Sequence, residues 1–361
     1  MTRDDLRRSA VSRTLFPPTS LQRALDALGF VQADPIRAPA RAQDLTLRHR
    51  VAGYRAGDLE RCYPDLDVHE DFFVNYGFVT GAVQTLMHPR RGRAPWSVTR
   101  ARQVPALLEF VRTHGPVHPR AVDDHFSHGQ VTNYWGGSSN ATTNLLDAMH
   151  YRGLLRVARR DAGIRIYAAR EDEVAKDAVT RDAGTRRAQL DALVDVIVSN
   201  YAPLPAASLS SLVRRLRYAV PQWTRSLDAT LERAKRRLAH ERVEGVEWYW
   251  QAEQATEAAS DDVVRLLAPF DPVVWDRRRF EILWGWAYRF EAYTPAPKPP
   301  LGYYALPLLW RDRVIGWGNV AVKNGAMHAD VGYVASRPPR GPAFRSALEE
   351  ELERLRAFLD L

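Results

Sequence analysis

The chain has 361 residues, of which 45% are hydrophobic and 26% charged, enough for about two to four small folded domains. Its 51 lysines and arginines outnumber its 43 aspartates and glutamates, and the resulting net charge of +8 favours a polyanionic partner. Cys62 is the only cysteine, which excludes an internal disulfide, and the absence of a leader-like or long apolar run predicts a soluble cytoplasmic protein.

The first hundred residues are weakly periodic. Helices are expected at 20–28, 43–54 and 57–62, and an apolar run covers 72–86. The first of these helices has leucines at helical spacing and stops at Gly29, the residue type that most easily adopts the left-handed conformation that ends a helix. Phe30 and Val31 then favour extended backbone.

Residues 101–172 carry the clearest modular pattern. The predicted helices include 104–111, 119–126 and a segment through 145–149, and the predicted strands are 154–158 and 164–168. Ser138 and Ser139 are candidate caps for the third helix, and Gly163 supplies the turn between the two strands. Three helices followed by a hairpin predict a winged helix.

The same order recurs in the next segment. Helices are expected at 185–200, 206–215 and 224–239, and a second wing at 241–250 turns at Gly245. The tail differs, because short β-rich runs are predicted at 282–286, 302–310, 314–322 and 327–333. A closing helix over 344–359, with Leu348, Leu352, Leu355 and Leu359 on one stripe, is expected to cover an edge of this sheet.

Gln32 and Asp34 form the most informative pair of polar residues. In an extended segment, residues two apart point to the same side, so an amide and a carboxylate here would both reach one water molecule or one sugar carbon. The same residues also have a structural interpretation. Asp before Pro is a good helix start, with Asp34 as the N-cap and Pro35 in the first turn. Spacing alone favours the cap.

Two distant segments resemble the YcaQ/AlkZ family of winged-helix DNA glycosylases. The first is 29–51, which contains Val-Gln-Ala-Asp at 31–34 and Arg-Ala-Gln-Asp-Leu at 41–45. The second is Leu-Leu-Ala-Pro-Phe-Asp-Pro-Val-Val-Trp-Asp-Arg-Arg at 266–278, followed by Tyr-Thr-Pro-Ala-Pro-Lys at 293–298 and Gly-Tyr-Tyr at 302–304. The resemblance covers most of the chain.

The resemblance implies an α+β fold of tandem winged-helix, or helix-turn-helix, domains with a small C-terminal antiparallel β-barrel or sheet. The expected segments are 1–100, a first winged-helix-like domain with the Gln-x-Asp motif, then winged helices at 101–175 and 183–255, and a β-rich module with its closing helix at 263–361. The assignment of the first segment depends on the family.

The family uses a Gln-x-Asp or Gln-x-Gln pair for catalysis, so the resemblance makes Gln32 and Asp34 the expected catalytic residues. A base alkylated at a ring nitrogen is already a good leaving group, and little acid catalysis is needed. Asp34 would stabilise the oxocarbenium-like sugar or act as a general base, and Gln32 would orient the attacking water. No cofactor or metal is required.

The expected partner is double-stranded DNA that contains alkylated bases of the N7-alkylguanine type, with interstrand crosslinks as a further substrate. Basic groups would hold the phosphates, although such side chains are more often only solvated. The predicted DNA contacts are Arg37, Arg41, Arg48, Asn75, Arg156, Arg159, Arg160, Arg214, Arg215, Lys298 and Tyr303. We expect a monofunctional, monomeric, nucleoid-associated enzyme.

Some residues leave alternatives open. Lys298 lies in a Pro-rich segment and is a candidate Schiff-base nucleophile, but a loop tip that contacts phosphate is favoured. His125 and His128 have metal-like spacing without a complete ligand set. Asn75 stands where the family usually has a histidine, and Ala33 is smaller than the usual residue between the pair. The alternative function is a non-enzymatic winged-helix DNA-binding protein in which Asp34 only caps a helix.

Overall fold

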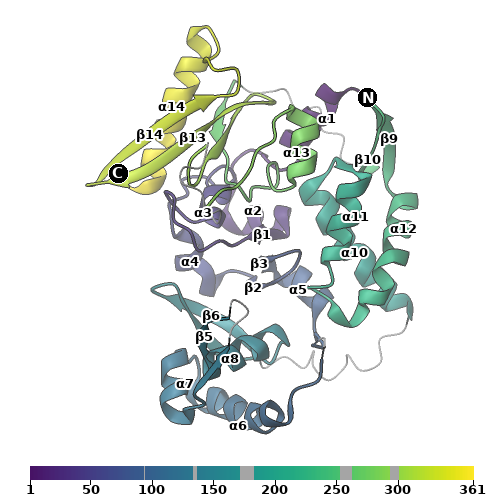
Figure 1. Cartoon of the computed structure of the whole chain (residues 1–361), viewed down its shortest axis with the longest axis vertical. Coiled ribbons are helices and arrows are strands. Elements are labelled where there is room, and N and C mark those ends of the chain that lie inside the picture. The colour runs from purple at the N-terminus through teal and green to yellow at the C-terminus, as the bar shows by residue number, and fades with distance from the viewer. Residues whose placement is uncertain (93, 133–135, 171–182, 253–261, 293–300) are drawn as a thin grey trace. The chain divides into compact units, whose positions relative to one another are not determined.

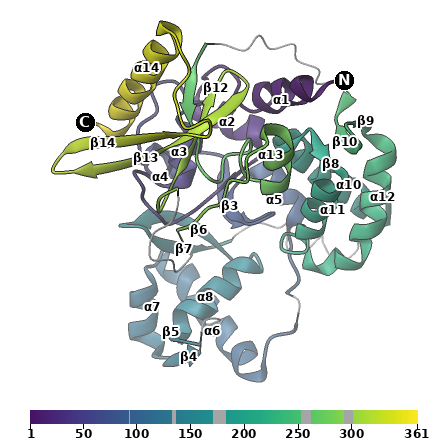
Figure 2. The same ribbon diagram turned by 45° about the horizontal axis from the view of Figure 1, so that its top comes forward.

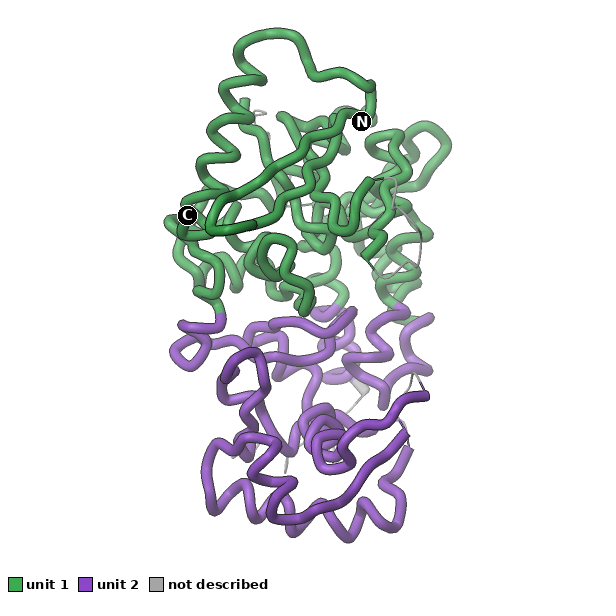
Figure 3. Tube along the Cα trace, turned by 60° about the vertical axis from the view of Figure 1, so that its left-hand side comes forward, with its two compact units in different colours: residues 1–59, 194–213, 229–361 green, residues 60–193, 214–228 purple. Residues whose placement is uncertain are grey.

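The computed structural model describes residues 1–92, 94–132, 136–170, 183–252, 262–292 and 301–361, and Figure 1 shows their elements in chain order. By their contacts these residues form two compact units (Figure 3). Unit 1 contains 1–59, 194–213 and 229–361, and unit 2 contains 60–193 and 214–228. The four segments expected from the sequence stay a prediction.

Unit 1 begins with α1 (Arg3–Ser12), α2 (Leu21–Leu28), β1 (Phe30–Gln32) and α3 (Ala42–Leu47). The prediction for α2 is confirmed: the Ser20 side chain accepts the Arg23 N–H at its start, and Gly29 ends it with φ of 64°. The helix predicted at 43–54 is shorter than expected, because α3 ends at Leu47 with Arg48 as its C-cap. The short helix α4 (Asp58–Cys62) has residues in both units.

Unit 2 continues with a 3₁₀ turn, η1 (Tyr63–Asp65), the hairpin β2 (Val68–Phe72) and β3 (Tyr76–Thr80), and α5 (Gly81–Met87). The two strands pair antiparallel with Val68 opposite Thr80 and Phe72 opposite Tyr76. The apolar run seen in the sequence therefore spans one strand and one helix. Phe73 and Val74, in the turn between the strands, are fully buried.

Three helices and a hairpin follow in unit 2, as predicted. They are α6 (Val98–His114), α7 (Pro119–Phe126), α8 (Ala141–Tyr151), β6 (Leu155–Asp161) and β7 (Ile164–Ala169), with β4 (Gln130–Thr132) and β5 (Ser138–Asn140) before α8. The cap of α8 is Asn140 rather than a serine, since its side chain accepts the Thr143 N–H. Gly163 turns the hairpin with φ of 86°.

The next elements also match the predicted order of helices and wing. They are α10 (Ala183–Tyr201), β8 (Leu204–Pro205), α11 (Ala206–Arg215), η3 (Pro221–Ser226), α12 (Leu227–Arg237), β9 (Ala239–Val243) and β10 (Val246–Trp250). The strands form a small antiparallel sheet in unit 1 in the order β8-β10-β9, with Gly245 at the turn. The tandem arrangement of winged helices stays a prediction.

The C-terminal part of unit 1 is a four-stranded antiparallel sheet. Its strands are β11 (Val264–Leu266), β12 (Leu306–Trp310), β13 (Arg313–Lys323) and β14 (Ala326–Tyr333), in sequence order. The helix α14 (Pro342–Leu359) lies along the edge strand β11, and Figure 2 shows it beside the sheet. The prediction that the closing helix covers an edge is confirmed.

Two expectations for this tail are wrong in detail. The run 282–286 is not a strand, because α13 (Arg277–Trp284) covers its start and Gly285 ends that helix in the left-handed conformation. The helix α14 does not bury the expected leucine stripe. Its buried residues are Phe344, Ala347, Glu351, Leu355 and Phe358. The period is helical as predicted, but the inward face includes a glutamate that binds two arginines of unit 1.

The protein is thus a mixed α/β structure with several small sheets. Among the helices of the described residues, none is long and apolar enough to cross a membrane.

Candidate functional site

The candidate site in unit 1 is built around Gln32, the last residue of β1. Its side chain is 6% exposed, and its Oε1 accepts a hydrogen bond of 2.6 Å from the indole Nε1 of Trp275. An indole N–H can only donate, so the carbonyl end of the amide must face the tryptophan. The NH₂ end of Gln32 is consequently the end that remains for another molecule.

Asp34 is 7% exposed and is not a helix N-cap, because residues 33–41 form no helix. Its Oδ1 accepts the backbone N–H of Ile36 at 2.9 Å, which closes a local turn around Pro35. Its own backbone N–H donates to Oε1 of Gln43 at 3.3 Å. The helix-cap interpretation is therefore wrong, and α3 helps to hold the backbone of Asp34.

The motif Arg-Ala-Gln-Asp-Leu at 41–45 supports the segment that carries Gln32 and Asp34. Gln43 and Asp44 lie in α3 with 3% and 4% exposure, and Asp44 Oδ1 accepts hydrogen bonds from the Tyr54 hydroxyl and the Gly57 N–H. Burial raises the pKa of Asp44, and those hydrogen bonds partly oppose the rise. Gln43 and Asp44 thus both form hydrogen bonds inside unit 1.

The other side of β1 is held by α10. Asn200 donates from Nδ2 to the Phe30 carbonyl at 3.0 Å, and the Tyr201 ring lies against Trp275 with centroids 5.3 Å apart. Trp275 therefore has a fixed environment. Sequence patterns alone assigned no role to Asn200, Tyr201 or Trp275, although Trp275 stands in the second segment that carries the resemblance.

The arrangement supplies two complementary groups two residues apart in the chain. An amide NH₂ can donate to a water oxygen, and a carboxylate can accept a proton from that water or stabilise a nearby positive charge. Both groups are buried, where the effective dielectric constant is lower and electrostatic interactions are stronger than in bulk water. Such a pair suits hydrolysis at a centre that becomes cationic.

Most of the predicted DNA contacts lie at the surface. Arg37, Asn75, Arg156, Arg159, Arg214 and Tyr303 are exposed, whereas Arg41 and Arg215 are partly buried. Arg159 and Arg214 form exposed ion pairs with Asp161 and Asp228, and Arg215 donates to the Val74 carbonyl. Lys298 lies outside the described residues. Exposed ion pairs are weak and leave a guanidinium able to exchange its partner for a phosphate.

Two of the predicted contacts have internal partners instead. The side chain of Arg48 is 3% exposed and pairs with the fully buried Glu351 at 2.5 Å. Arg160 in β6 binds both carboxylate oxygens of Glu70, at 2.7 and 2.6 Å. Removing Arg160 would leave the buried Glu70 carboxylate without its arginine, whereas Glu351 would keep Arg354 after removal of Arg48. Both arginines thus have an internal ion-pair partner, and their role as DNA contacts stays a prediction.

A buried polar network in unit 2 was not predicted. Asp71 accepts from His88 Nε2 at 2.6 Å and from Arg90 Nη1 at 2.7 Å, and both partners are almost fully buried. Burial lowers the pKa of His88 to about 4 despite the attraction of Asp71. Burial would raise the pKa of Asp71, but the charge of Arg90 and the bond from His88 outweigh it and hold that pKa well below its usual value.

We expect this network to make the fold sensitive to mild acid. His88 stays neutral in the folded chain down to about pH 4, while in the unfolded chain it takes up a proton below about pH 6.5. Acidification through this window therefore favours unfolding, by about 2 kcal/mol. Asp71 adds no slope there, because its pKa is below the window in both states. Urea unfolding at pH 7.5 and pH 4.5 measures the loss.

Two variants separate His88 from the other titrating groups. His88→Gln keeps an N–H donor for Asp71 and should reduce the pH dependence, while His49 and His150, whose pKa values burial also lowers, keep part of it. His114→Gln changes an exposed histidine and should keep the wild-type slope. Equal slopes for both variants would contradict the role of His88.

The metal-like histidine cluster is part of the helical packing. His125 lies against the Phe110 ring with centroids 4.7 Å apart, and Asp123 accepts from Asn140 and Thr142. Within the part of the chain that the structure describes, no group of three or more histidine, cysteine, aspartate or glutamate side chains could hold a metal ion.

Comparison with known proteins identifies the class. The family model described as DNA glycosylase AlkZ-like matches residues 25–358, and the chain belongs to this family. Membership makes it a DNA glycosylase, a hydrolase that acts on DNA in repair. The structure of the Streptomyces sahachiroi DNA glycosylase AlkZ is similar over 99% of this chain and 96% of that chain, with 15% identity and a TM-score of 0.65. This likeness shows a shared fold.

Trp275 provides a direct test of how Gln32 is held. In Trp275→Phe the ring remains but the N–H is lost, so the Gln32 amide can rotate. We expect base excision to slow by about 10–100-fold with little change in DNA affinity. Single-turnover excision measures the rate. The matched control is Trp284→Phe, which loses an indole bond to the Asp312 carbonyl. An equal loss in both variants would show that general destabilisation, not Gln32, is responsible.

Proposed function

We propose that this DNA glycosylase removes bases alkylated in the manner of N7-alkylguanine from double-stranded DNA, with Gln32 and Asp34 as its catalytic residues. The proposal rests on the 2.6 Å hydrogen bond from Trp275 to Gln32, which fixes the direction of the amide. Gln32 then donates from Nε2 to the oxygen of the attacking water. Asp34 accepts a proton from that water or stabilises the cationic sugar.

The positive charge on the alkylated base explains why so little else is needed. The base leaves with the bonding electrons and becomes neutral, while the sugar becomes oxocarbenium-like. Attack by the water forms the new C–O bond and leaves an abasic site. This route is hydrolytic and monofunctional, because no lysine Schiff base is formed. In the proposal Lys298 contacts phosphate with Tyr303.

DNA is held mainly through its phosphates. The proposed contacts are Arg37, Arg41, Asn75, Arg156, Arg159, Arg214, Arg215, Lys298 and Tyr303. Contacts to phosphates carry no sequence information, so recognition depends on the damaged base. Asn75 stands where the family usually has a histidine. Asparagine carries no charge, unlike a protonated histidine, and this difference changes how the lesion is held. We propose a cytoplasmic, nucleoid-associated monomer that also acts on interstrand crosslinks.

Single-turnover base release from a duplex with one N7-methylguanine tests the proposal. Alkali cleaves the strand at abasic sites, and the undamaged duplex is the control. Cleavage only in the damaged duplex supports the proposed substrate class and route. Cleavage before alkali treatment would instead show lyase chemistry. An intact N7-methylguanine duplex, together with release from a crosslinked duplex, would restrict the substrate to bulkier lesions.

A further inference from the structure

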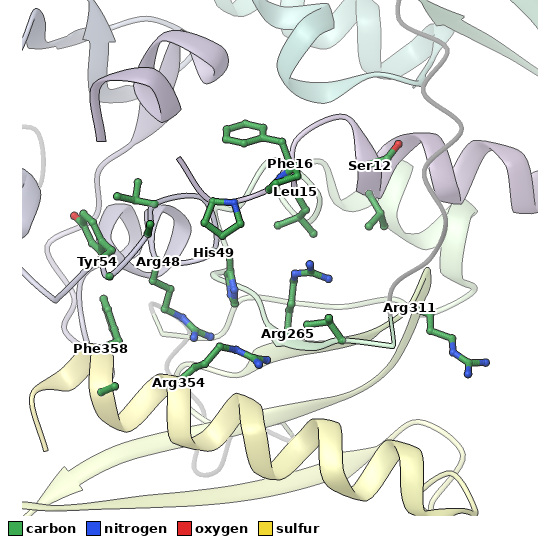
Figure 4. A pocket seen from close by; sticks show the side chains of 18 of the residues that line it. Ser12, Leu15, Phe16, Arg48, His49, Tyr54, Arg265, Arg311, Arg354 and Phe358 are labelled. Atoms are coloured by element: carbon green, nitrogen blue, oxygen red, sulfur yellow. The ribbon is translucent and has the colours of Figure 1, made fainter. Parts of the chain in front are cut away.

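Unit 1 has a second concave site that the glycosylase chemistry does not use. A cavity of about 950 Å³ lies beside the segment that follows α3, and neither Gln32, Asp34 nor Trp275 lines it (Figure 4). We call it the basic cavity. Its lining includes Leu15, Phe16, Arg48, His49, Tyr54, Arg265, Arg354 and Phe358. Volumes of this order are typical of small-molecule sites.

Three arginines gather on its polar wall. Arg48 and Arg354 share one carboxylate, since Glu351 binds Arg48 at 2.5 Å through Oε1 and Arg354 at 3.1 Å through Oε2. Arg265 adds a third cation, and Figure 4 shows these arginines and His49 in one part of the cavity. Glu350, 3.8 Å from Arg354, is more distant. Clustered guanidiniums bind phosphate and carboxylate groups by paired hydrogen bonds.

The other basic side chains of the lining are less suited to an anion, because each already pairs with an aspartate: Arg8 with Asp5 and Arg55 with Asp360. Arg311 pairs with Asp262 at 2.5 Å and lies apart in Figure 4, and the acidic Asp312 lies next to it in the chain. The cavity is therefore polarised, with its cationic end at the arginines of β11, α14 and the α3 C-terminus.

His49 adds a hydrogen-bond acceptor to this end. Its Nε2 lies 3.0 Å from the Leu266 carbonyl, which can only accept, so Nε2 carries the hydrogen. Burial, together with the charge of Arg48, lowers the pKa of His49 well below its usual value, and the ring is neutral at pH 7. Nδ1 has no partner among the described residues and offers a lone pair to a ligand N–H.

The remaining wall is apolar and aromatic. Leu15 and Phe16 come from the segment after α1, while Tyr54 and Phe358 stack with centroids 6.3 Å apart and an interplanar angle of 15°. A bare phosphate would leave this surface unused. A ligand that combines an anion, an N–H donor and a flat heterocycle would use all three parts of the lining.

We propose that the basic cavity binds a nucleoside monophosphate, either free or as the 5′-phosphorylated end of a DNA strand. The phosphate lies against Arg265 and Arg354, the base packs on the aromatic wall, and a base N–H donates to His49 Nδ1. Binding in the basic cavity is independent of base excision, because neither Gln32 nor Asp34 lines the cavity.

The probe is AMP that carries a fluorescent N-methylanthraniloyl group on its ribose, titrated with the full-length protein. We expect saturable binding that unlabelled AMP displaces and adenosine displaces at least about tenfold less well. Arg265→Gln should weaken binding by about tenfold or more. Arg345→Gln, an exposed arginine of α14 outside the lining, should leave it unchanged.

A second variant guards against a folding defect in Arg265→Gln. Ala357 is an exposed lining residue of α14, and Ala357→Trp fills the cavity while keeping every charge. It should abolish AMP binding. Competition by short duplexes shows whether the ligand is a DNA end or a free nucleotide. If a 5′-phosphorylated duplex competes better than the same duplex with a 5′-hydroxyl, the ligand is the DNA end. If only AMP competes, the ligand is the free nucleotide.

Three results would overturn the proposal. They are an absence of saturable binding, unchanged binding in Ala357→Trp, and displacement by inorganic phosphate as strong as that by AMP. None of these measurements depends on excision. A failed glycosylase assay with normal AMP binding would reject only the proposed substrate or catalytic pair.

Discussion

Asp34→Asn is expected to slow single-turnover excision of N7-methylguanine by about 10²–10⁴-fold and to leave DNA affinity unchanged. The amide is neutral, so it neither takes a proton from water nor stabilises a cationic sugar. The fold should tolerate the change, because an asparagine Oδ1 can accept the Ile36 N–H as the aspartate does. The loss would therefore appear in the chemical step rather than in binding.

Asp26→Asn is the matched control for this variant. Asp26 lies on α2, eight residues earlier, with its side chain exposed and bonded to Gln22. It carries the same charge change and should excise at the wild-type rate. Excision by Asp34→Asn within about threefold of wild type would reject the proposed role of Asp34, since one lost catalytic group costs far more. Filter binding to the same duplex checks the affinity.

The sequence predicted local order better than the contacts of the site. Gly29 ended α2 where its conformational freedom indicated, and the turn glycines 163 and 245 located both hairpins. These features depend on neighbouring residues only. The C-terminal run 282–286 misled because its aromatic residues favour a strand, whereas packing of Phe280 and Leu283 in the core keeps the segment in α13.

The assignment of Asp34 illustrates the other limit. Asp followed by Pro is a good helix start, and the local signal favoured a cap. In the structure Gln43 holds the Asp34 backbone and Trp275 holds Gln32. Both partners are distant in sequence or belong to another motif. Resemblance to the family indicated this pair because it carries long-range information that residue spacing does not, and the catalytic role of the pair stays a prediction.

Charge in the interior was the least predictable feature. Arg48 and Arg160 appear in the sequence as ordinary basic residues, yet each binds a buried glutamate. The inward face of α14 likewise includes Glu351 in place of a leucine stripe. An apolar pattern assumes that charges face solvent, and this assumption fails wherever an ion pair satisfies both partners inside the fold.

The largest stability effect is expected at the ion pair between Arg50 and Asp271. Both side chains are fully buried, and the guanidinium binds the two carboxylate oxygens at 2.8 and 3.0 Å. Arg50 also donates to the carbonyls of Thr14 and Thr46, so it joins α3 to the chain before α2. Asp271 lies four residues before Trp275, and the pair therefore supports the segment that positions Gln32.

Arg50→Gln should lower the free energy of unfolding by about 3–5 kcal/mol, because it leaves the Asp271 carboxylate buried without its counter-charge. Urea denaturation at pH 7.5 measures the change. Arg55→Gln is the matched control, since Arg55 pairs with Asp360 at the surface and its side chain is 61% exposed. Its unfolding should be close to wild type, because exposed ion pairs contribute little.

The double variant Arg50→Gln/Asp271→Asn distinguishes the unpaired charge from lost packing. With both charges removed, the asparagine that replaces Asp271 can still accept the Val273 N–H, and much of the lost stability should return. If the double variant is no more stable than Arg50→Gln, the unpaired charge of Asp271 is not the cause of the lost stability. Excision measured below the unfolding transition then shows whether the pair also sets the position of Trp275. If the folded double variant excises more slowly than wild type, this salt bridge acts on the Gln32 amide through the segment 271–275.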